Sequence, residues 1–179
     1  LASGSGAYGC RMIGNVYNAS YKSGVVLQCN GWTSITVENC LIANNHTHDV
    51  APIGLGGSHG QATFRNTTIA NNDSKIGTIS CFCGSDNGTS DANKLTLVNT
   101  VIYGNTAGGA VQTFNPLSIY TTYDIRHCNY PEADPNDGKG NFYADPRFAD
   151  AANGDFSLGK GSACVDVGED IPTLTEDID

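Results

Sequence analysis

The stretch Ile35-Thr-Val-Glu-Asn-Cys-Leu-Ile-Ala-Asn-Asn45 recurs twice without gaps, as Ala62-Thr-Phe-Arg-Asn-Thr-Thr-Ile-Ala-Asn-Asn72 and as Leu95-Thr-Leu-Val-Asn-Thr-Val-Ile-Tyr-Gly-Asn105. When the copies are aligned on their central Asn, they are offset by 27 and 33 residues. Weaker copies flank them at Arg11–Asn15 and at Tyr123–Cys128. A recurrence of roughly 20 to 45 residues with variable insertions is typical of a solenoid.

Within each copy, apolar and polar residues alternate up to the Asn, and an apolar pair follows. This period of two predicts a strand with one buried face. Stacked about 4.8 Å apart, the copies would pair their strands in parallel and align equal positions. The predicted inward columns are Ile13, Val37, Phe64, Leu97 and Ile125, and, after the turn, Ile42, Ile69 and Ile102. We therefore predict an all-β chain, a parallel β-helix of about five coils over residues 1–130.

The central Asn of each copy predicts a structural ladder at the turn. The predicted ladder is Asn15, Asn39, Asn66 and Asn99, with His127 in the same column of the last copy. Asn tolerates the left-handed backbone that a tight turn needs, and its amide can bond the Asn of the neighbouring coils.

The composition fits this fold and argues against several partners. The 179 residues include 22 Gly, and only 15% are charged, so long amphipathic helices are not expected. Nine basic and eighteen acidic residues give a net charge of −9, which disfavours nucleic acid and repels polyuronates unless a basic patch or a cation intervenes. No apolar run reaches the roughly 20 residues of a transmembrane segment. The chain opens at Leu1 without Met, which is consistent with processing or truncation upstream.

Seven Cys at irregular spacing are not the framework of a stapled mini-protein. Most are expected to be small buried side chains in the stack, and one or two bridges stay open as an alternative.

The C-terminal part carries four distinctive runs. They are Asp124–Cys128, Gly140–Phe148 with Ala-Asp-Pro-Arg-Phe, Ala152–Leu158 with Asn-Gly-Asp-Phe-Ser-Leu, and Gly161–Gly168 with Gly-Ser-Ala-Cys-Val-Asp-Val-Gly. With the repeats, they resemble bacterial right-handed parallel β-helix proteins of the pectate-lyase-like superfamily, of the surface or adhesin type. The resemblance implies a right-handed coil, a secreted or cell-surface location, and a capping segment at residues 131–179 of the same domain. Aromatic residues of that segment, such as Phe148 and Phe156, would then cover the open end of the core.

By the same resemblance, enzymes of this fold place their sites on the outward face of a parallel sheet. Glu38, Arg65 and Arg126 fall in one outward column and are the candidate catalytic residues of a polysaccharide lyase or glycoside hydrolase. Arg65, Arg126 and the aromatic Trp32 are also the candidate ligand-binding residues. The alternative is that the column is a solvated sheet face whose Glu38–Arg65 pair contributes at most about 1 kcal/mol.

Two segments hold metal-ligand residue types. His46 and His48 would point to the same side of a strand, and His59 follows in the next loop, so these three are the zinc candidates. Asp134 and Asp137 lie in a Gly-rich loop that could hold a structural Ca²⁺, although the spacing is not that of an EF-hand. The alternatives are solvated loop histidines and an ordinary turn, and no other cofactor is expected.

The favoured function is an extracellular or cell-surface module, structural or adhesive, that binds polysaccharide, a cell-surface glycan or another surface partner without catalysis. The alternatives are a lyase or hydrolase fragment acting on the sheet face, and a filament subunit that self-associates through its N-terminal coil.

Overall fold

The computed structural model describes residues 4–17, 26–81, 93–114 and 121–172, and these form strands with a single short 3₁₀ helix, Ala151–Asn153. Sheet A is the longest wall of the coil, with five parallel strands in the order β1-β5-β9-β13-β17. Its strands are β1 (Ser5–Tyr8), β5 (Ser34–Glu38), β9 (Gln61–Arg65), β13 (Asn93–Val98) and β17 (Thr121–Arg126). The register pairs each copy of the repeat with the next, for example Val37 with Phe64 and Phe64 with Leu97.

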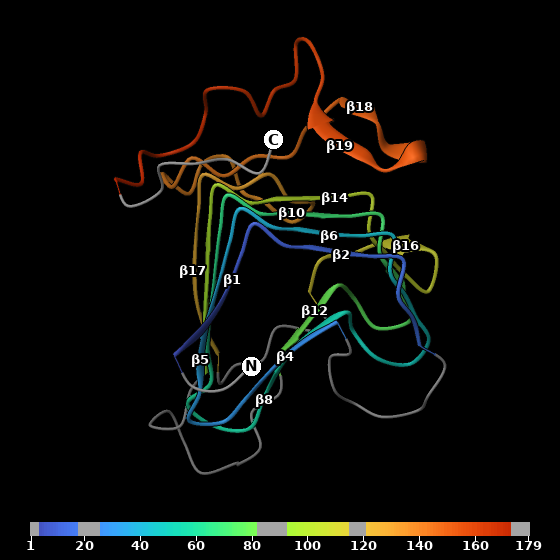
Figure 1. Ribbon diagram of the computed structural model, residues 1–179. Coiled ribbons are helices and arrows are strands. Elements are labelled where there is room, and N and C mark those ends of the chain that lie inside the picture. Colours follow the sequence, from blue (N-terminus) through green and yellow to red (C-terminus); the bar gives the residue numbers. More distant parts are fainter. Residues whose placement is uncertain (1–3, 18–25, 82–92, 115–120, 173–179) are drawn as a thin grey trace.

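Three further sheets complete the winding, and each also stacks equivalent strands in parallel. Sheet B contains β2 (Arg11–Ile13), β6 (Leu41–Ala43), β10 (Thr68–Ala70) and β14 (Val101–Tyr103). Sheet C contains β3 (Val16–Tyr17), β7 (His46–Thr47), β11 (Asp73–Ser74) and β15 (Thr106–Ala107), and β16 (Ala110–Val111) pairs antiparallel with β15. Sheet D contains β4 (Leu27–Asn30), β8 (Ile53–Gly56) and β12 (Ile79–Cys81). In Figure 1 the coils lie behind one another, so the sheets appear as the sides of a prism.

The parallel β-helix predicted from the repeats is therefore confirmed, with fewer complete coils than the expected five. Within the described ranges, three coils place a strand in every sheet, namely β1–β4, β5–β8 and β9–β12. Up to Phe114, where the description of the fourth coil stops, this coil meets sheet D through a bridge between Ile79 and Phe114, and the fifth coil begins with β17. The recurrent turn residue marks the end of each sheet A strand. It does not show whether the remaining strands of that coil pair with those of the neighbouring coil.

The core lies inside the prism and follows the predicted columns from the second coil onward. Val37, Phe64 and Leu97 are completely buried, and Ile125 is nearly so. Ile42, Ile69 and Ile102 form the second buried column, in sheet B. Each coil thus buries side chains that only the neighbouring coils can cover, which is why the chain winds rather than folds back.

The prediction for the first coil was wrong by one strand. Ile13 pairs with Ala43 in sheet B and is 37% exposed, whereas Ala7 takes the inward position beside Val37. The turn in this coil is made by Gly9, with φ 57°, so the Asn that marks the other copies is missing there. Because that marker is missing, the sequence pattern aligns Arg11–Asn15 with the sheet A strands. The structure instead places Arg11–Ile13 in sheet B and Ser5–Tyr8 in sheet A.

The turn that follows each sheet A strand has the left-handed backbone that was expected. The φ angles are 50° at Asn39, 45° at Asn66, 49° at Asn99 and 51° at His127. Asn99 Nδ2 also donates to Asn66 Oδ1 at 3.0 Å, as a ladder requires. Asn15 does not belong to this column, because it stacks on Asn45 at the corner between sheets B and C.

That second corner holds an Asn ladder, formed by Asn15, Asn45, Asn72 and Asn105, of which the last three are buried and Asn15 is exposed. Each side-chain amide donates to the Oδ1 of the next Asn at 2.8 Å, and the main-chain N–H of each of the first three donates to the same oxygen. The amides of Asn45, Asn72 and Asn105 also donate to a main-chain carbonyl in the coil before, at 2.8–3.0 Å. A buried polar column is thereby satisfied without water.

The C-terminal segment first continues the stack and then turns over its side. Asn129 bridges to Val101 and to Phe142, which extends sheet B beyond β14. The hairpin of β18 (Phe148–Asp150) and β19 (Asp155–Leu158) then lies outside the prism, above sheet B (Figure 1). Phe156 is buried there against Leu41, Ala43 and Ala70, a cluster separate from the main core. Phe148 and Phe156 therefore cover a side of the coil, not its open end as expected.

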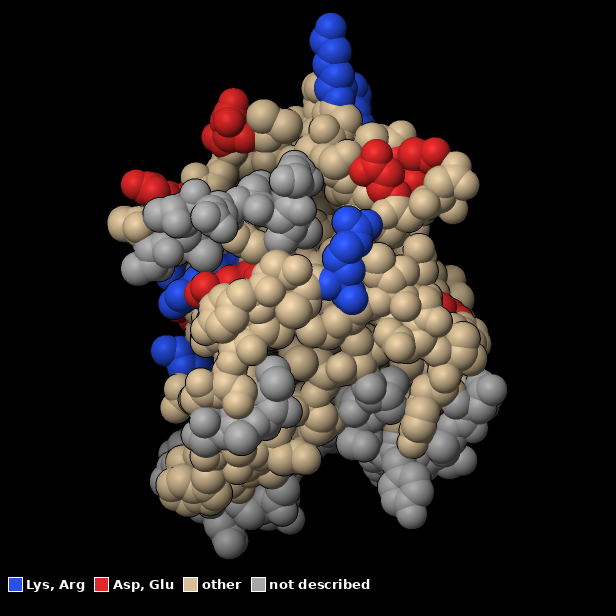
Figure 2. Space-filling view, in the orientation of Figure 1, with Lys and Arg blue, Asp and Glu red and all other residues tan. Residues whose placement is uncertain are grey.

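The charge is distributed unevenly between the two regions. Residues 131–179 contain twelve of the eighteen acidic and three of the nine basic residues, so they carry the whole net charge of −9. Figure 2 shows the charged side chains of the described residues gathered mainly over the upper part of this view, while the lower part has almost none. In the part of the chain that is described, no helix is long and apolar enough to cross a membrane.

Candidate functional site

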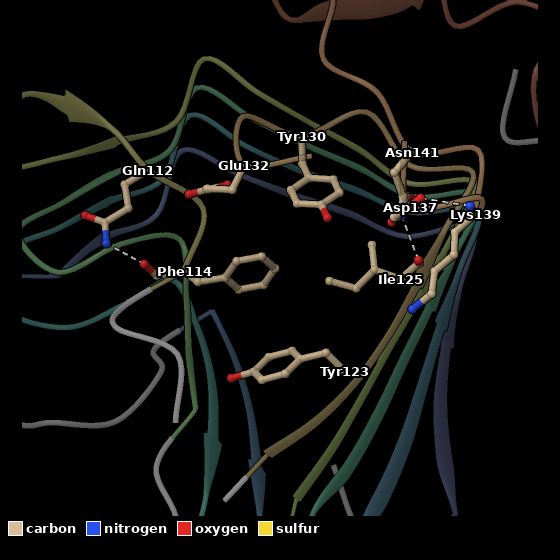
Figure 3. Close-up of a pocket in the computed structure, with 9 residues that line it drawn as sticks. All are labelled: Gln112, Phe114, Tyr123, Ile125, Tyr130, Glu132, Asp137, Lys139 and Asn141. Carbon is tan, nitrogen blue, oxygen red and sulfur yellow. Dashed lines mark hydrogen bonds between the residues drawn. The ribbon is translucent and has the colours of Figure 1, made fainter. Parts of the chain in front are cut away.

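A cavity of about 410 Å³ opens where the last coils leave the core partly uncovered (Figure 3). It is lined by Gln112, Phe114, Tyr123, Ile125, Tyr130, Glu132, Asp137, Lys139 and Asn141. Tyr123 and Ile125 come from inward positions of β17, and Phe114 from the end of the fourth coil. Within the described residues the fourth coil meets sheet D at Phe114, whose ring faces the inward side chains of the fifth coil across the cavity.

Three aromatic rings form the apolar wall of this cavity. Phe114 lies between the two tyrosines, with ring centroids 5.8 Å from Tyr123 and 6.1 Å from Tyr130. Both pairs are edge-to-face, at 66° and 75°, which is the arrangement that aromatic quadrupoles favour. Tyr130 is 8% exposed, and its burial, with the nearby Asp137 carboxylate, raises the pKa of its hydroxyl, which therefore stays protonated at neutral pH.

Polar groups surround the rings and are held by local hydrogen bonds. The Glu132 carboxylate accepts the Thr113 N–H at 2.7 Å, and Gln112 donates to the Phe114 carbonyl. Asp137 accepts from Asn141 Nδ2 at 2.9 Å and from the Lys139 N–H at 2.8 Å. These two bonds lower the pKa of Asp137, the Asn141 bond most. Aromatic faces with nearby carboxylate, amide and ammonium groups form a site suited to a polar ligand with an apolar face.

The predicted catalytic column is present, but its charges are paired within the protein. Arg65 Nη1 lies 2.7 Å from Glu38 Oε1 across adjacent strands. Arg126 binds Glu169 through Nε at 2.8 Å and Asp124 through Nη1 at 2.6 Å. The repeat predicts the position of Arg126 in this column, but no sequence pattern points to Glu169 of the C-terminal segment as its partner.

Trp32 lies at the opposite end of sheet A from these arginines, in the turn between β4 and β5. Its side chain is 76% exposed, and its indole stacks on the His59 ring with centroids 3.9 Å apart. Both residues have left-handed backbones, with φ 56° and 63°, which is rare for bulky side chains. This stack is an exposed aromatic surface apart from the cavity. It gives His59 a packing role against Trp32.

The three histidines predicted to hold zinc are not brought together. His46 and His48 both point outward from sheet C, as the strand pattern predicted. His46 Nδ1 binds Asp73 at 2.8 Å and His48 Nδ1 binds Asp49 at 2.9 Å, while His59 stacks on Trp32. Among the described residues there is no group of three His, Cys, Asp or Glu side chains that could hold a metal ion.

The predicted Ca²⁺ loop has the hydrogen bonds of an ordinary turn. Asp134 Oδ1 accepts the Asn136 N–H at 2.9 Å, and Asp137 accepts the Lys139 N–H in the same way. Structural Ca²⁺ at this loop stays a prediction.

Comparisons of the chain with protein-family models, curated proteins and solved structures give no match. Membership of the pectate-lyase-like superfamily therefore also stays a prediction.

Of the residues that line the cavity, Asp137 is the one that the sequence marks as a candidate site residue. Phe114 lies in no copy of the repeat, and Tyr130 and Glu132 follow the last copy, so no periodic signal marks them. The one usable signal was Tyr123, an aromatic residue in a column otherwise occupied by Ile35, Ala62 and Leu95.

Proposed function

We propose that this protein is an extracellular or cell-surface β-helix module that binds a glycan in the cavity at the end of its core and does not cleave it. The observation that carries the proposal is the combination of three aromatic rings with Glu132, Asp137, Gln112 and Lys139 around one cavity. A pyranose ring has apolar C–H faces that pack on aromatic rings, and hydroxyl groups that bond carboxylates and amides. A volume of about 410 Å³ lies within the range of small-ligand sites.

The charges around the cavity favour a neutral glycan. Glu132 and Asp137 line it, and the C-terminal segment that supplies them carries the net charge of −9. A polyuronate would bring more negative charge into this field, and of the described residues that line the cavity Lys139 alone is a cation. Neutral hexose or N-acetylhexosamine units meet no such repulsion.

Binding without cleavage is supported by the pairing of the two arginines that a lyase site would use. Arg65 and Arg126 are each held by a carboxylate of the same chain. Releasing either of them to neutralise a uronate would leave Glu38 or Glu169 without its partner.

The test is a panel of neutral and acidic glycans, read for both binding and cleavage by calorimetry and by product analysis. We expect a neutral glycan to bind and no product to form. Tyr123→Ala should weaken that binding at least about tenfold, which corresponds to about 1.4 kcal/mol. Tyr143→Ala, an exposed tyrosine outside the cavity, should not. Specific depolymerisation of any glycan would overturn the proposal.

The single Trp of the chain reports where the glycan binds. Trp32 precedes β5, which is separated from β17 by β9 and β13, so a ligand in the cavity should leave its fluorescence unchanged. Quenching that saturates with the glycan would instead assign binding to the Trp32–His59 stack.

Self-association is the second candidate, and the N-terminal edge of the stack favours it. In the described residues β1, β2, β3 and β4 pair on one side only. Tyr8 and Val16 on this edge are 62% and 68% exposed. Such edges are templates for another strand. Concentration-dependent association in sedimentation experiments, abolished by Val16→Lys, would support this candidate.

A further inference from the structure

One column of small residues follows the turn after each sheet A strand. Its members are Cys10, Cys40, Thr67, Thr100 and Cys128. Each of the five donates from its Oγ or Sγ to the main-chain carbonyl two residues earlier, for example Cys10 to Tyr8 and Thr67 to Arg65. Cys and Thr therefore make the same hydrogen bond here. This bond explains why a small donor side chain is present, whichever of the two residues supplies it.

Cys10 and Cys40 differ from the other members of this column because each has a Cys as its neighbour in the adjacent coil. The Cys10 main-chain N–H donates to Cys40 Sγ at 3.3 Å, and the Leu41 N–H donates to the Cys10 carbonyl at 2.8 Å. Neighbouring parallel strands lie about 4.8 Å apart, which is within the range of Cα separations that disulfides span. Among the six Cys of the described residues, Cys128 has Thr100 as its neighbour, and Leu55 separates Cys29 from Cys81.

Of the two thiols, that of Cys10 is the more accessible to solvent. Cys10 is half-buried and lines a cavity of about 650 Å³ at the N-terminal end of the core. Cys40 is 1% exposed but lines a second cavity, of about 440 Å³, beneath the C-terminal hairpin. A small oxidant therefore does not need the coil to unfold.

We propose that Cys10 and Cys40 form a disulfide in an oxidising environment and so clamp the first described coil to the second. This cross-link goes beyond glycan binding and does not depend on it. The cross-link would reinforce the packing of the first described coil on the second, where the inward residue of the first coil is the small Ala7 beside Val37. A secreted location would supply the oxidising conditions.

The chemistry is thiol–disulfide exchange with a low-molecular-weight disulfide such as oxidised glutathione. The Cys10 thiolate attacks one sulfur of that disulfide, and one glutathione thiolate leaves. The Cys40 thiolate then attacks Cys10 Sγ, and the second glutathione leaves. Two protein thiols are oxidised, one external disulfide is reduced to two thiols, and their protons pass to the released glutathiones. Burial raises the pKa of Cys40, so the more exposed Cys10 attacks first.

The test incubates the native full-length chain with oxidised glutathione, blocks free thiols in denaturant and maps the peptides without reduction. Cleavage with trypsin and then after Glu38 separates Cys10, Cys29 and Cys40 into different peptides. We expect one linked pair, Cys10 with Cys40, and a fall in free thiols from seven to five. The melting temperature should rise by about 5–10 °C relative to the reduced protein.

Matched variants separate this cross-link from the structural work of the column. In Cys128→Ser, which changes the same column without a Cys neighbour, the linked pair and the oxidation-dependent melting shift should both persist. In Cys10→Ser both should disappear, while the reduced protein melts as before. Seven free thiols in the oxidised native wild type, or a linked pair that involves any other Cys, would overturn the proposal.

Discussion

At the scale of single residues, Asn has two structural roles in this coil. Asn39, Asn66 and Asn99 make left-handed turns close to the surface, whereas Asn45, Asn72 and Asn105 form the buried ladder. In the repeat the two kinds lie six residues apart. The doubled Asn at the end of two copies supplies both a left-handed residue, Asn44 or Asn71, and a ladder residue.

The ladder predicts a large effect for a small change at its centre. Asn72→Ala removes the Oδ1 that accepts two donors of Asn45. It also removes the side-chain donor to the Ile42 carbonyl and one of the two donors to Asn105 Oδ1, which keeps the main-chain N–H of residue 72. Unsatisfied buried groups cost about 1–3 kcal/mol each, so we expect about 2–4 kcal/mol of unfolding free energy to be lost in urea titrations. Asn66→Gly keeps the left-handed turn and removes one exposed bond, and it should cost less than about 1 kcal/mol. Equal losses in both variants would contradict the ladder's role.

At the scale of elements, the strands of one sheet depend on one another, and the C-terminal hairpin depends on the side of the coil. Leu41, Ala43 and Ala70 leave an apolar strip on the outside of sheet B, and Phe156 with Phe148 covers it. Outward apolar residues in a repeat that otherwise alternates are the sequence sign that something packs there. What packs there could not be foreseen, because the covering residues lie more than 70 positions away.

This packing predicts that the hairpin can be released while the coil stays folded. Phe156→Ala should remove about 3–5 kcal/mol of local packing, because the ring is 6% exposed. We expect faster amide hydrogen exchange in β18 and β19 and unchanged protection in β5, β9 and β13. Leu158→Ala, at a 41% exposed side chain of the same strand, should leave the exchange rates of the hairpin as they are. Loss of protection throughout sheet A would show instead that hairpin and coil unfold together.

At the scale of the whole molecule, the charge separates a neutral coil from an acidic C-terminal segment. Despite that excess of negative charge, hydrogen bonds lower the pKa of Asp137 through Asn141 and of Asp155 through Ser157. Both carboxylates therefore hold protons less readily in the folded chain than in the unfolded chain. Their contribution to stability is complete above the ordinary Asp pKa of 3.8 and is lost as the pH falls through the lower folded values.

We therefore expect the urea midpoint to stay level between about pH 7 and pH 5 and to fall below about pH 4. Asp137→Asn should make the urea midpoint fall less steeply below about pH 4, because the carboxylate that takes up a proton is gone. Lys160→Gln, which leaves these carboxylates in place, should follow the wild-type curve. A midpoint that rises on acidification would mean that repulsion within the segment outweighs the hydrogen bonds.

The winding, the parallel pairing, most of the inward columns and the left-handed turns can all be predicted from the repeat along the chain. These features repeat, and stacking makes each residue the neighbour of its own equivalent, so a pattern along the chain becomes a column in space. The places where the pattern breaks are visible only in the folded chain: the alignment of the first coil on Gly9, the partner of Arg126, the stack of Trp32 on His59, and the cavity. Those features join residues from unrelated positions, and their contacts follow from packing in three dimensions, which leaves no period in the sequence.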